Sequence, residues 1–370
     1  MNTKGLLVFI CSLFLFCIST QAFSACAFIQ KEGNKTTATK SFTMPIINTI
    51  SVPPDTPVGK EIYRQKISLS GQGPMSIKCD SAGLFYFSYK YLTTPITPPT
   101  YSNEVYNTNL PGIGIKFVSG LRSGDAFPVT YPSTNCTAAS TICNWTNGFA
   151  AASWFSLIKT ANNVPAGKVS ASSLPSVIYS IGQAGAMVDV YKITLSGDIQ
   201  ITTPTCDITL ASQSMTVNLG RHEMSTFNGK GATTDWKDAS INLSNCGQFF
   251  GNSQGANVIA TFNGDNVKVT MPYSNFVTVT LTSLNGIEDA TKGIMKLDDS
   301  PNQATGIGIQ LSTSEDTAGL VNLTRGFTQA LPMNGVQEVT IPLYARYIQT
   351  TDRATAGLAN GRLEYTIAYQ

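Results

Sequence analysis

The last fourteen residues of the chain, from Gly357 to Gln370, read GLANGRLEYTIAYQ. Four apolar or aromatic side chains alternate with other residues up to the end of this stretch. The period of two places all four on one face of a β-strand, because successive side chains of a strand point to opposite faces. The stretch therefore predicts a strand whose apolar face needs a partner to cover it. The four residues are Leu363, Tyr365, Ile367 and Tyr369.

Short alternating runs also fill the segment between about residue 200 and this strand. Turn-forming Gly, Asn, Asp and Pro residues separate the runs. Several short strands with regular turns are typical of an immunoglobulin-like β-sandwich. The apolar positions of the runs are Ile208, Leu210, Val217, Leu219, Ile241, Leu243, Val258, Ala260, Phe262, Val277, Val279 and Leu281.

The first half of the chain has the same rhythm. We expect strands at Ile62–Ser70, Leu84–Tyr91 and Val188–Leu195, and the polar, turn-rich segment 196–205 predicts a boundary near residue 200. The fold class predicted is all-β: two tandem immunoglobulin-like sandwiches, with a complete front sandwich over residues 25–200 and a second over residues 201–370. Phe85, Phe87, Tyr89 and Tyr91 share one strand face, and core packing is favoured over a platform for sugars.

Composition argues against several classes of function. Charged residues make up 12% of the 370 residues and the net charge is +2, so the basic surface of a nucleic-acid binder is missing. His222 is the single histidine, and no catalytic motif surrounds it. We therefore expect no catalytic residues, no cofactor and no enzymatic activity.

The first residues predict export. The apolar run Leu6–Ile18, followed by Ala22-Phe23-Ser24, is typical of a signal peptide spanning residues 1–24, which leaves Ala25 as the first mature residue. The alternative is a lipoprotein signal, which would leave Cys26 acylated. No later stretch approaches the roughly 20 consecutive apolar residues of a membrane helix.

Six cysteines remain after the signal peptide, an even set in an oxidising compartment. Fifteen pairings are possible, and the clustering along the chain favours three local ones. A zinc site is disfavoured because no CxxC pair is present, so we expect no metal. The expected pairs are Cys26 with Cys79, Cys136 with Cys143, and Cys206 with Cys246.

The ending resembles that of subunits of bacterial chaperone-usher pili, in which a glycine fourteen residues from the end and a penultimate tyrosine bracket an alternating final strand. Gly357 and Tyr369 occupy these positions. Other segments of the second half resemble the same family in order: Thr205–Ile208, Val217–Gly220, Ile241–Cys246, Gly306–Leu311 and Leu343–Tyr347.

This resemblance implies that the second sandwich lacks its last strand. Gly357, Leu363, Tyr365, Ile367 and Tyr369 would then belong to a groove that another chain fills. In the family, a periplasmic chaperone fills it first, and the N-terminal extension of the adjacent subunit replaces the chaperone at the outer-membrane usher. The expected location is the periplasm and then the cell surface, at the tip of the fimbrium.

The front half resembles the N-terminal domains of two-domain tip adhesins of type 1-like fimbriae, mainly through Tyr106–Gly114. This implies a lectin-like domain that binds a host or surface glycan. The alternatives are a protein or abiotic surface as target, or a non-adhesive minor pilus subunit. Mannose-binding members begin with phenylalanine, whereas Ala25 is expected first here.

Two front-half loops are the candidates for receptor contact, residues 123–125 and 132–147. Short polar side chains there suit hydrogen bonds to sugar hydroxyls, and a tryptophan suits stacking on a pyranose. The candidate residues are Asp125, Asn135, Asn144 and Trp145.

Overall fold

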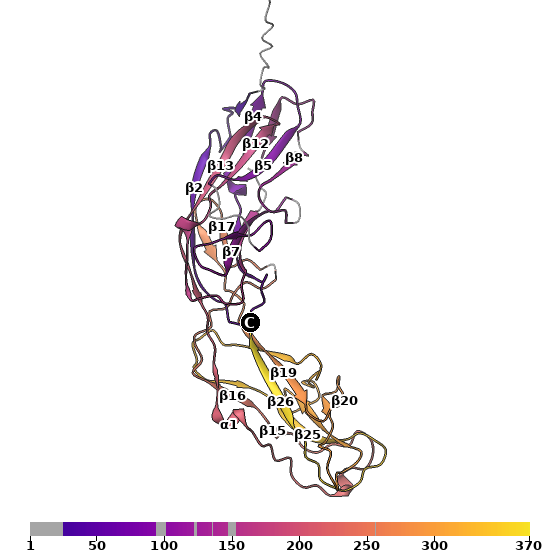
Figure 1. The fold of residues 1–370 in the computed structure, drawn as a ribbon. Coiled ribbons are helices and arrows are strands. Elements are labelled where there is room, and N and C mark those ends of the chain that lie inside the picture. The colour runs from indigo at the N-terminus through magenta and orange to yellow at the C-terminus, as the bar shows by residue number, and fades with distance from the viewer. Residues whose placement is uncertain (1–24, 94–100, 122–123, 135, 147–152, 256) are drawn as a thin grey trace, which may run out of the picture.

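The computed structural model describes residues 25–93, 101–121, 124–134, 136–146, 153–255 and 257–370. Its regular structure is almost entirely β, which confirms the all-β prediction. Two lobes stack end to end, and the C-terminus lies between them (Figure 1). The short helices are η1 (Ser70–Gln72), η2 (Ala171–Ser173), α1 (Leu210–Gln213) and η3 (Met224–Thr226). In the described ranges, no helix has the length and apolarity needed to cross a membrane.

The front lobe is built from three sheets. The first has the order β11 (Gly167–Ser170), β13 (Ala186–Thr202), β12 (Val177–Gln183), β5 (Phe85–Tyr91), β8 (Val129–Pro132), with β2 (Lys40–Ser51) parallel to β13. The second has the order β18 (Val267–Val269), β17 (Ala260–Phe262), β3 (Glu61–Ile67), β10 (Ser153–Lys159), β7 (Ile113–Ser119), β6 (Tyr106–Asn107). The third joins β1 (Cys26–Phe28), β4 (Met75–Cys79) and β9 (Ile142–Trp145).

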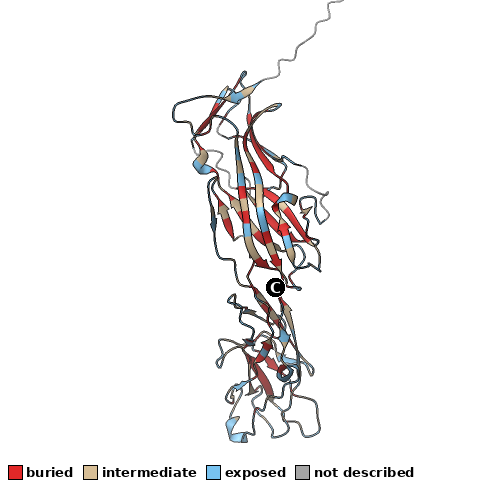
Figure 2. Ribbon diagram, turned by 90° about the vertical axis from the view of Figure 1, so that its left-hand side faces the viewer, coloured by how far each residue is buried: buried red, intermediate tan, exposed pale blue. Residues whose placement is uncertain are grey.

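Aromatic side chains fill the front core. Tyr89 is fully buried, and its ring centroid lies 5.0 Å from that of Tyr179 and 5.3 Å from that of Phe127. Phe85 is also fully buried, while Phe87 and Tyr91 pack against the same core at its margin. The aromatic face of β5 therefore packs inward, as the sequence favoured, and buried residues run through the middle of the lobe (Figure 2).

One hairpin of the front lobe comes from the second half of the chain. β17 pairs in parallel with β3, and β18 pairs with β17 (Figure 1). Assigning Ala260 and Phe262 to the second sandwich was therefore wrong, because both lie on β17 beside β3, and Phe262 is buried in the front core. The expectation of a front sandwich complete within residues 25–200 was also wrong, since the hairpin supplies two strands and β13 runs on to Thr202.

The remaining described strands form three sheets in the back lobe. The first has the order β14 (Asp207–Ile208), β16 (Ile241–Ser244), β24 (Val339–Ile341), and the second has the order β15 (Lys237–Asp238), β25 (Tyr344–Gln349), β22 (Ile307–Ser312), β21 (Ile294–Met295), β20 (Ile287–Asp289). The third has the order β23 (Phe327–Ala330), β19 (Phe276–Ser283), β26 (Leu363–Tyr369). Of the predicted apolar positions, Ile241, Val277 and Val279 are fully buried. Leu210 is 85% exposed on α1, so its predicted inward position was wrong.

All three predicted disulfides are present. Cys26 and Cys79 face each other on β1 and β4, and Cys136 is joined to Cys143 at the start of β9. Cys206 and Cys246 join the segments that flank β14 and β16. Each bond links neighbouring segments of one lobe, which confirms the pairing predicted from the clustering.

Candidate functional site

An apolar groove with a volume of about 360 Å³ lies beside β26 in the back lobe. The segment Ser212–Met215 forms one wall, and Leu363 and Tyr365 of β26 form the other. Core residues such as Ile241 and Leu311 reach its floor. The groove therefore opens directly onto the hydrophobic core of the lobe.

β26 forms an edge of its sheet. In the described part of the chain its only strand partner is β19. Gln370 and Phe276 exchange both backbone hydrogen bonds, N to O, at 2.8 and 3.0 Å. Backbone groups alternate in direction along an antiparallel strand. The alternate positions from Leu363 to Tyr369 therefore direct their N–H and C=O groups toward the open edge.

These alternate positions are the four apolar or aromatic residues that the sequence pattern placed on one face of the final strand. Leu363, Tyr365 and Ile367 are half-buried, and only Leu363 and Tyr365 line the groove. The Tyr365 hydroxyl donates a hydrogen bond to the Ser212 carbonyl across the groove mouth. Burial raises the pKa of the Tyr365 phenol, which therefore keeps its proton for this bond.

Tyr369 is covered by its own chain and is 8% exposed. Its ring stacks on Phe249 with centroids 6.3 Å apart, and its hydroxyl donates to the Cys206 carbonyl at 3.2 Å. Burial also raises the pKa of this phenol. Tyr369 thus anchors one end of β26, while the other end borders the groove.

Gly357 does not line the groove. A Cβ there would lie 2.4 Å from the Ala304 nitrogen and 2.5 Å from the Asn302 oxygen, so glycine permits close approach of two backbone segments. The sequence interpretation missed Gly361, which does line the groove and whose added Cβ would lie 2.7 Å from Ile309 Cδ1. The sequence feature that could have indicated Gly361 is its position two residues before the alternating run that begins at Leu363.

Of the four residues predicted to contact a receptor, the structure describes Asp125, Asn144 and Trp145. Asn135 lies outside the described residues. Asp125 is exposed and accepts a hydrogen bond from the Tyr131 hydroxyl at 2.8 Å. Asn144 is exposed on β9, where its Oδ1 accepts from Ser76 Oγ at 2.6 Å. Among the described residues, no hydrogen bond links Asp125 to Asn144.

Trp145 is not in an exposed loop, so that expectation was wrong. It is the last residue of β9 and is 6% exposed. Its ring packs edge-on against Phe85 and Phe87, with centroids 6.3 and 5.9 Å apart. Pairing of β9 with β4 turns Trp145 inward, because Met75 opposite it is fully buried.

The described parts of the chain show no cluster of three or more metal-binding side chains. His222 is exposed, and its Nε2 lies 2.8 Å from the Leu219 carbonyl oxygen. The distinctive features are therefore the apolar groove and the open strand edge.

Two family models together cover most of the chain. Residues 193–370 match the family described as "Fimbrial protein", and residues 43–198 match the "MrkD-like receptor binding domain". The chain is a two-domain fimbrial adhesin, with a receptor-binding domain in front of a fimbrial-protein domain. The adhesin is 24% identical over 322 residues to the "Fimbria adhesin protein" of Klebsiella pneumoniae, a match that covers 86% of this chain and 88% of that protein.

Two solved structures are similar to the adhesin. The receptor-binding domain of the plasmid-borne adhesin MrkD1P of Klebsiella pneumoniae is 21% identical, with a TM-score of 0.34, over 50% of this chain and 99% of that one. The CupB6 tip adhesin of Pseudomonas aeruginosa is 13% identical, with a TM-score of 0.35, over 92% of this chain and 94% of that one. The assignment rests on the family models and the curated relative. Fimbrial adhesins are a non-enzymatic class.

Proposed function

We propose that the adhesin attaches the bacterium to a receptor from the tip of a fimbrium, and that its back lobe is joined to the fimbrium by donor-strand complementation. The front lobe then carries the receptor site, and the back lobe receives the strand. The domain division is residues 25–200 and 201–370, apart from the β17–β18 hairpin.

The groove beside β26 carries the proposal. It combines an open backbone edge with a trough that reaches core side chains such as Leu343 and Ile309. A foreign strand laid there gains backbone hydrogen bonds from the edge and buries its own apolar side chains in the trough. Each buried side chain contributes about 1.5–3 kcal/mol. A single inserted strand therefore supplies substantial stability.

The partners follow from this geometry and from the family. A periplasmic chaperone fills the groove first, the outer-membrane usher is the site of exchange, and an extension of the adjacent subunit fills the groove in the fimbrium. The signal peptide of residues 1–24 directs the chain to the periplasm, from which it reaches the cell surface.

A glycan is our first choice of receptor. Asp125 and Asn144 offer exposed polar side chains, Asn135 remains in the proposed set, and buried Trp145 supports the strand that carries Asn144. A protein or an abiotic surface is the second choice. The match of the front half to a receptor-binding family favours both over a non-adhesive minor subunit.

A glycan array probed with the full chain, its groove filled by a fused donor strand, tests the receptor. We expect a defined set of glycans to bind. Asp125→Ala and Asn144→Ala should weaken that binding, whereas Asp198→Ala, which removes an exposed acid from β13, should not. Binding to proteins or plastic but to no glycan would exclude the glycan receptor and leave the attachment role in place.

A further inference from the structure

The β17–β18 hairpin lies within the front lobe although the back lobe surrounds it in sequence. Ser253 and residues 257–262 lie along the outer edge of β3, opposite the side on which β10 pairs. Without them, β3 would be an edge strand of the front sheet. Figure 1 shows β17 in orange among the indigo and magenta strands of the front lobe.

Backbone hydrogen bonds tie this segment to β3 along most of its length. Ser253 N donates to Ile62 O at 2.9 Å, and Ile259 N donates to Arg64 O at 2.9 Å. At the far end, Ser68 N donates to Phe262 O at 2.8 Å. The pairing is therefore a strand addition that satisfies the edge of β3.

Side chains of the hairpin enter the front core. Ile259 is fully buried and Phe262 is 2% exposed, and both belong to the front core rather than the back one. The Phe262 ring meets Phe42 of β2 edge-on, with centroids 6.1 Å apart. Since Phe42 also packs on Tyr191, Phe262 continues an aromatic layer that the front lobe begins.

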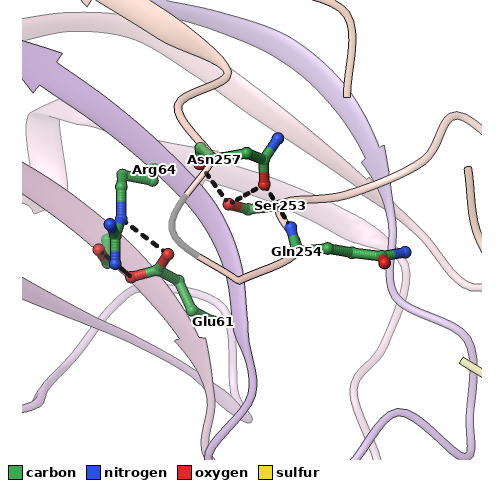
Figure 3. A network of polar contacts seen from close by, with 6 residues as sticks. Glu61, Arg64, Ser253, Gln254 and Asn257 are labelled. Carbon is green, nitrogen blue, oxygen red and sulfur yellow. Dashed lines mark hydrogen bonds and ion pairs between the residues drawn. The ribbon is translucent and has the colours of Figure 1, made fainter. Parts of the chain in front are cut away.

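The loop that leads into the hairpin is held by its own hydrogen bonds. Ser253 Oγ donates to Asn257 O at 2.9 Å, and Gln254 N donates to Asn257 Oδ1 at 2.5 Å. Figure 3 shows this loop passing beside β3, where Arg64 and Glu61 form an ion pair of 2.8 Å. The loop thus presents the hairpin to β3 in a fixed register.

The hairpin turn is shaped to fit the front lobe. Asn263 Oδ1 accepts from the backbone nitrogens of Asp265 and Asn266 at 2.9 and 2.8 Å. Gly264 has a φ of +104°, and a Cβ there would lie 2.6 Å from the side chain of Gln72. Glycine therefore meets both the turn conformation and the close packing.

We propose that the back half of the adhesin supplies an intramolecular donor strand to the front half. The receptor-binding lobe is then fully assembled only when the β17–β18 hairpin occupies the edge of β3. The occupant is residues 259–269 of the same chain. This inference does not depend on the identity of the receptor or on what fills the groove beside β26.

Hydrogen exchange on the full chain, purified with its chaperone or with a fused donor strand, tests the inference. Phe262→Asp should lower the protection of β3 amides at least tenfold and lower the unfolding temperature of the front lobe. Val269→Asp changes a side chain of the same hairpin that is 56% exposed, and it should do neither. Loss of protection confined to residues 257–269, with β3 and the front transition unchanged, would overturn the proposal.

A cross-link provides a second readout if Phe262→Asp gives no soluble protein. Thr261 and Lys66 are register partners on the outer face. The pair Thr261→Cys with Lys66→Cys should form a disulfide that raises the unfolding temperature of the front lobe. Lys268→Cys with Lys66→Cys is the control, because two strand spacings of about 4.8 Å exceed the reach of a disulfide. Absence of the first cross-link, or a cross-link without effect on the front transition, would contradict the proposal.

Discussion

Trp145 closes the core of the front lobe under β9. Its ring covers Phe85 and Phe87, so it stabilises the strand rather than contacting solvent. Trp145→Ala should lower the free energy of unfolding by about 3–5 kcal/mol, the usual cost of removing a large buried side chain. Denaturant unfolding of the donor-strand-fused adhesin measures the change.

Asn144→Ala is the matched control for this prediction. It changes the neighbouring, exposed residue and removes one hydrogen bond to Ser76, so it should cost about 0.5–1.5 kcal/mol. If Trp145→Ala unfolds like the wild type while adhesion is lost, Trp145 is a receptor contact and its structural role is refuted.

Buried tyrosines make the stability of the front lobe depend on alkaline pH. Burial raises the pKa values of Tyr63, Tyr89, Tyr91 and Tyr179 above the usual value of about 10. These phenols stay neutral in the folded state, whereas those of the unfolded chain ionise near pH 10. Stability should therefore be unaffected by these groups below about pH 10 and should fall as pH rises further.

Tyrosinate absorbance and circular dichroism recorded together check this expectation. The buried phenols should ionise in the same pH interval in which tertiary structure is lost. A gradual titration of all tyrosines with the tertiary signal intact would show that these phenols can ionise in the folded state.

At the scale of the strand, β26 has one face for the groove and one for solvent. Leu363→Asp places a charge in the groove and should abolish capture by the chaperone. Ile367→Asp, on the same strand face but beyond the groove, should also prevent capture by hindering addition of the incoming strand. Thr366→Asp is the control, because Thr366 is exposed on the other face. Co-purification with the chaperone measures capture, and a wild-type yield of the Leu363→Asp complex would show that this face does not bind the incoming strand.

Strand positions and facing were largely predictable, but sheet partners were not. The period of two correctly marked β5 and β26, because each keeps one face against a core over several residues. The same period found a strand at Val258–Phe262 but gave no information on which edge would receive it. That edge belongs to β3, almost two hundred residues earlier, and such a pairing leaves no local signal.

The candidate site likewise contains residues that the sequence predicted and residues that it did not. Leu363 and Tyr365 were marked by alternation, whereas the opposite wall at Ser212–Met215 has no regular strand pattern and became evident only in three dimensions. Trp145 was misplaced because polar neighbours such as Asn144 and Thr146 suggest a loop, while its burial depends on pairing with distant β4.

At the scale of the molecule, the two lobes are joined by more than one linker. The chain crosses after Thr202, returns near Ser253 to form the hairpin, and crosses again before β19. Asn275, fully buried at this junction, donates to the carbonyls of Ser51 and Gln370, each at 3.3 Å. Tyr369 N also donates to Asp55 Oδ2 at 2.9 Å. The end of the groove strand is thus fixed to the front lobe.

We propose that the back lobe is incomplete until another chain adds a strand beside β26. Leu363 and Tyr365 line the groove, and each such side chain left uncovered forfeits about 1.5–3 kcal/mol, a large share of the net stability of a domain, about 5–15 kcal/mol. The most direct test is the yield of soluble, monomeric full-length adhesin in the periplasm with and without a strand donor. We expect aggregation or degradation of the adhesin expressed alone. Co-expression with its chaperone, or fusion to a donor peptide, should give soluble monomer, and a donor peptide with aspartate at its inward positions should not. A stable monomer obtained with neither chaperone nor donor strand would show that the back lobe is complete on its own.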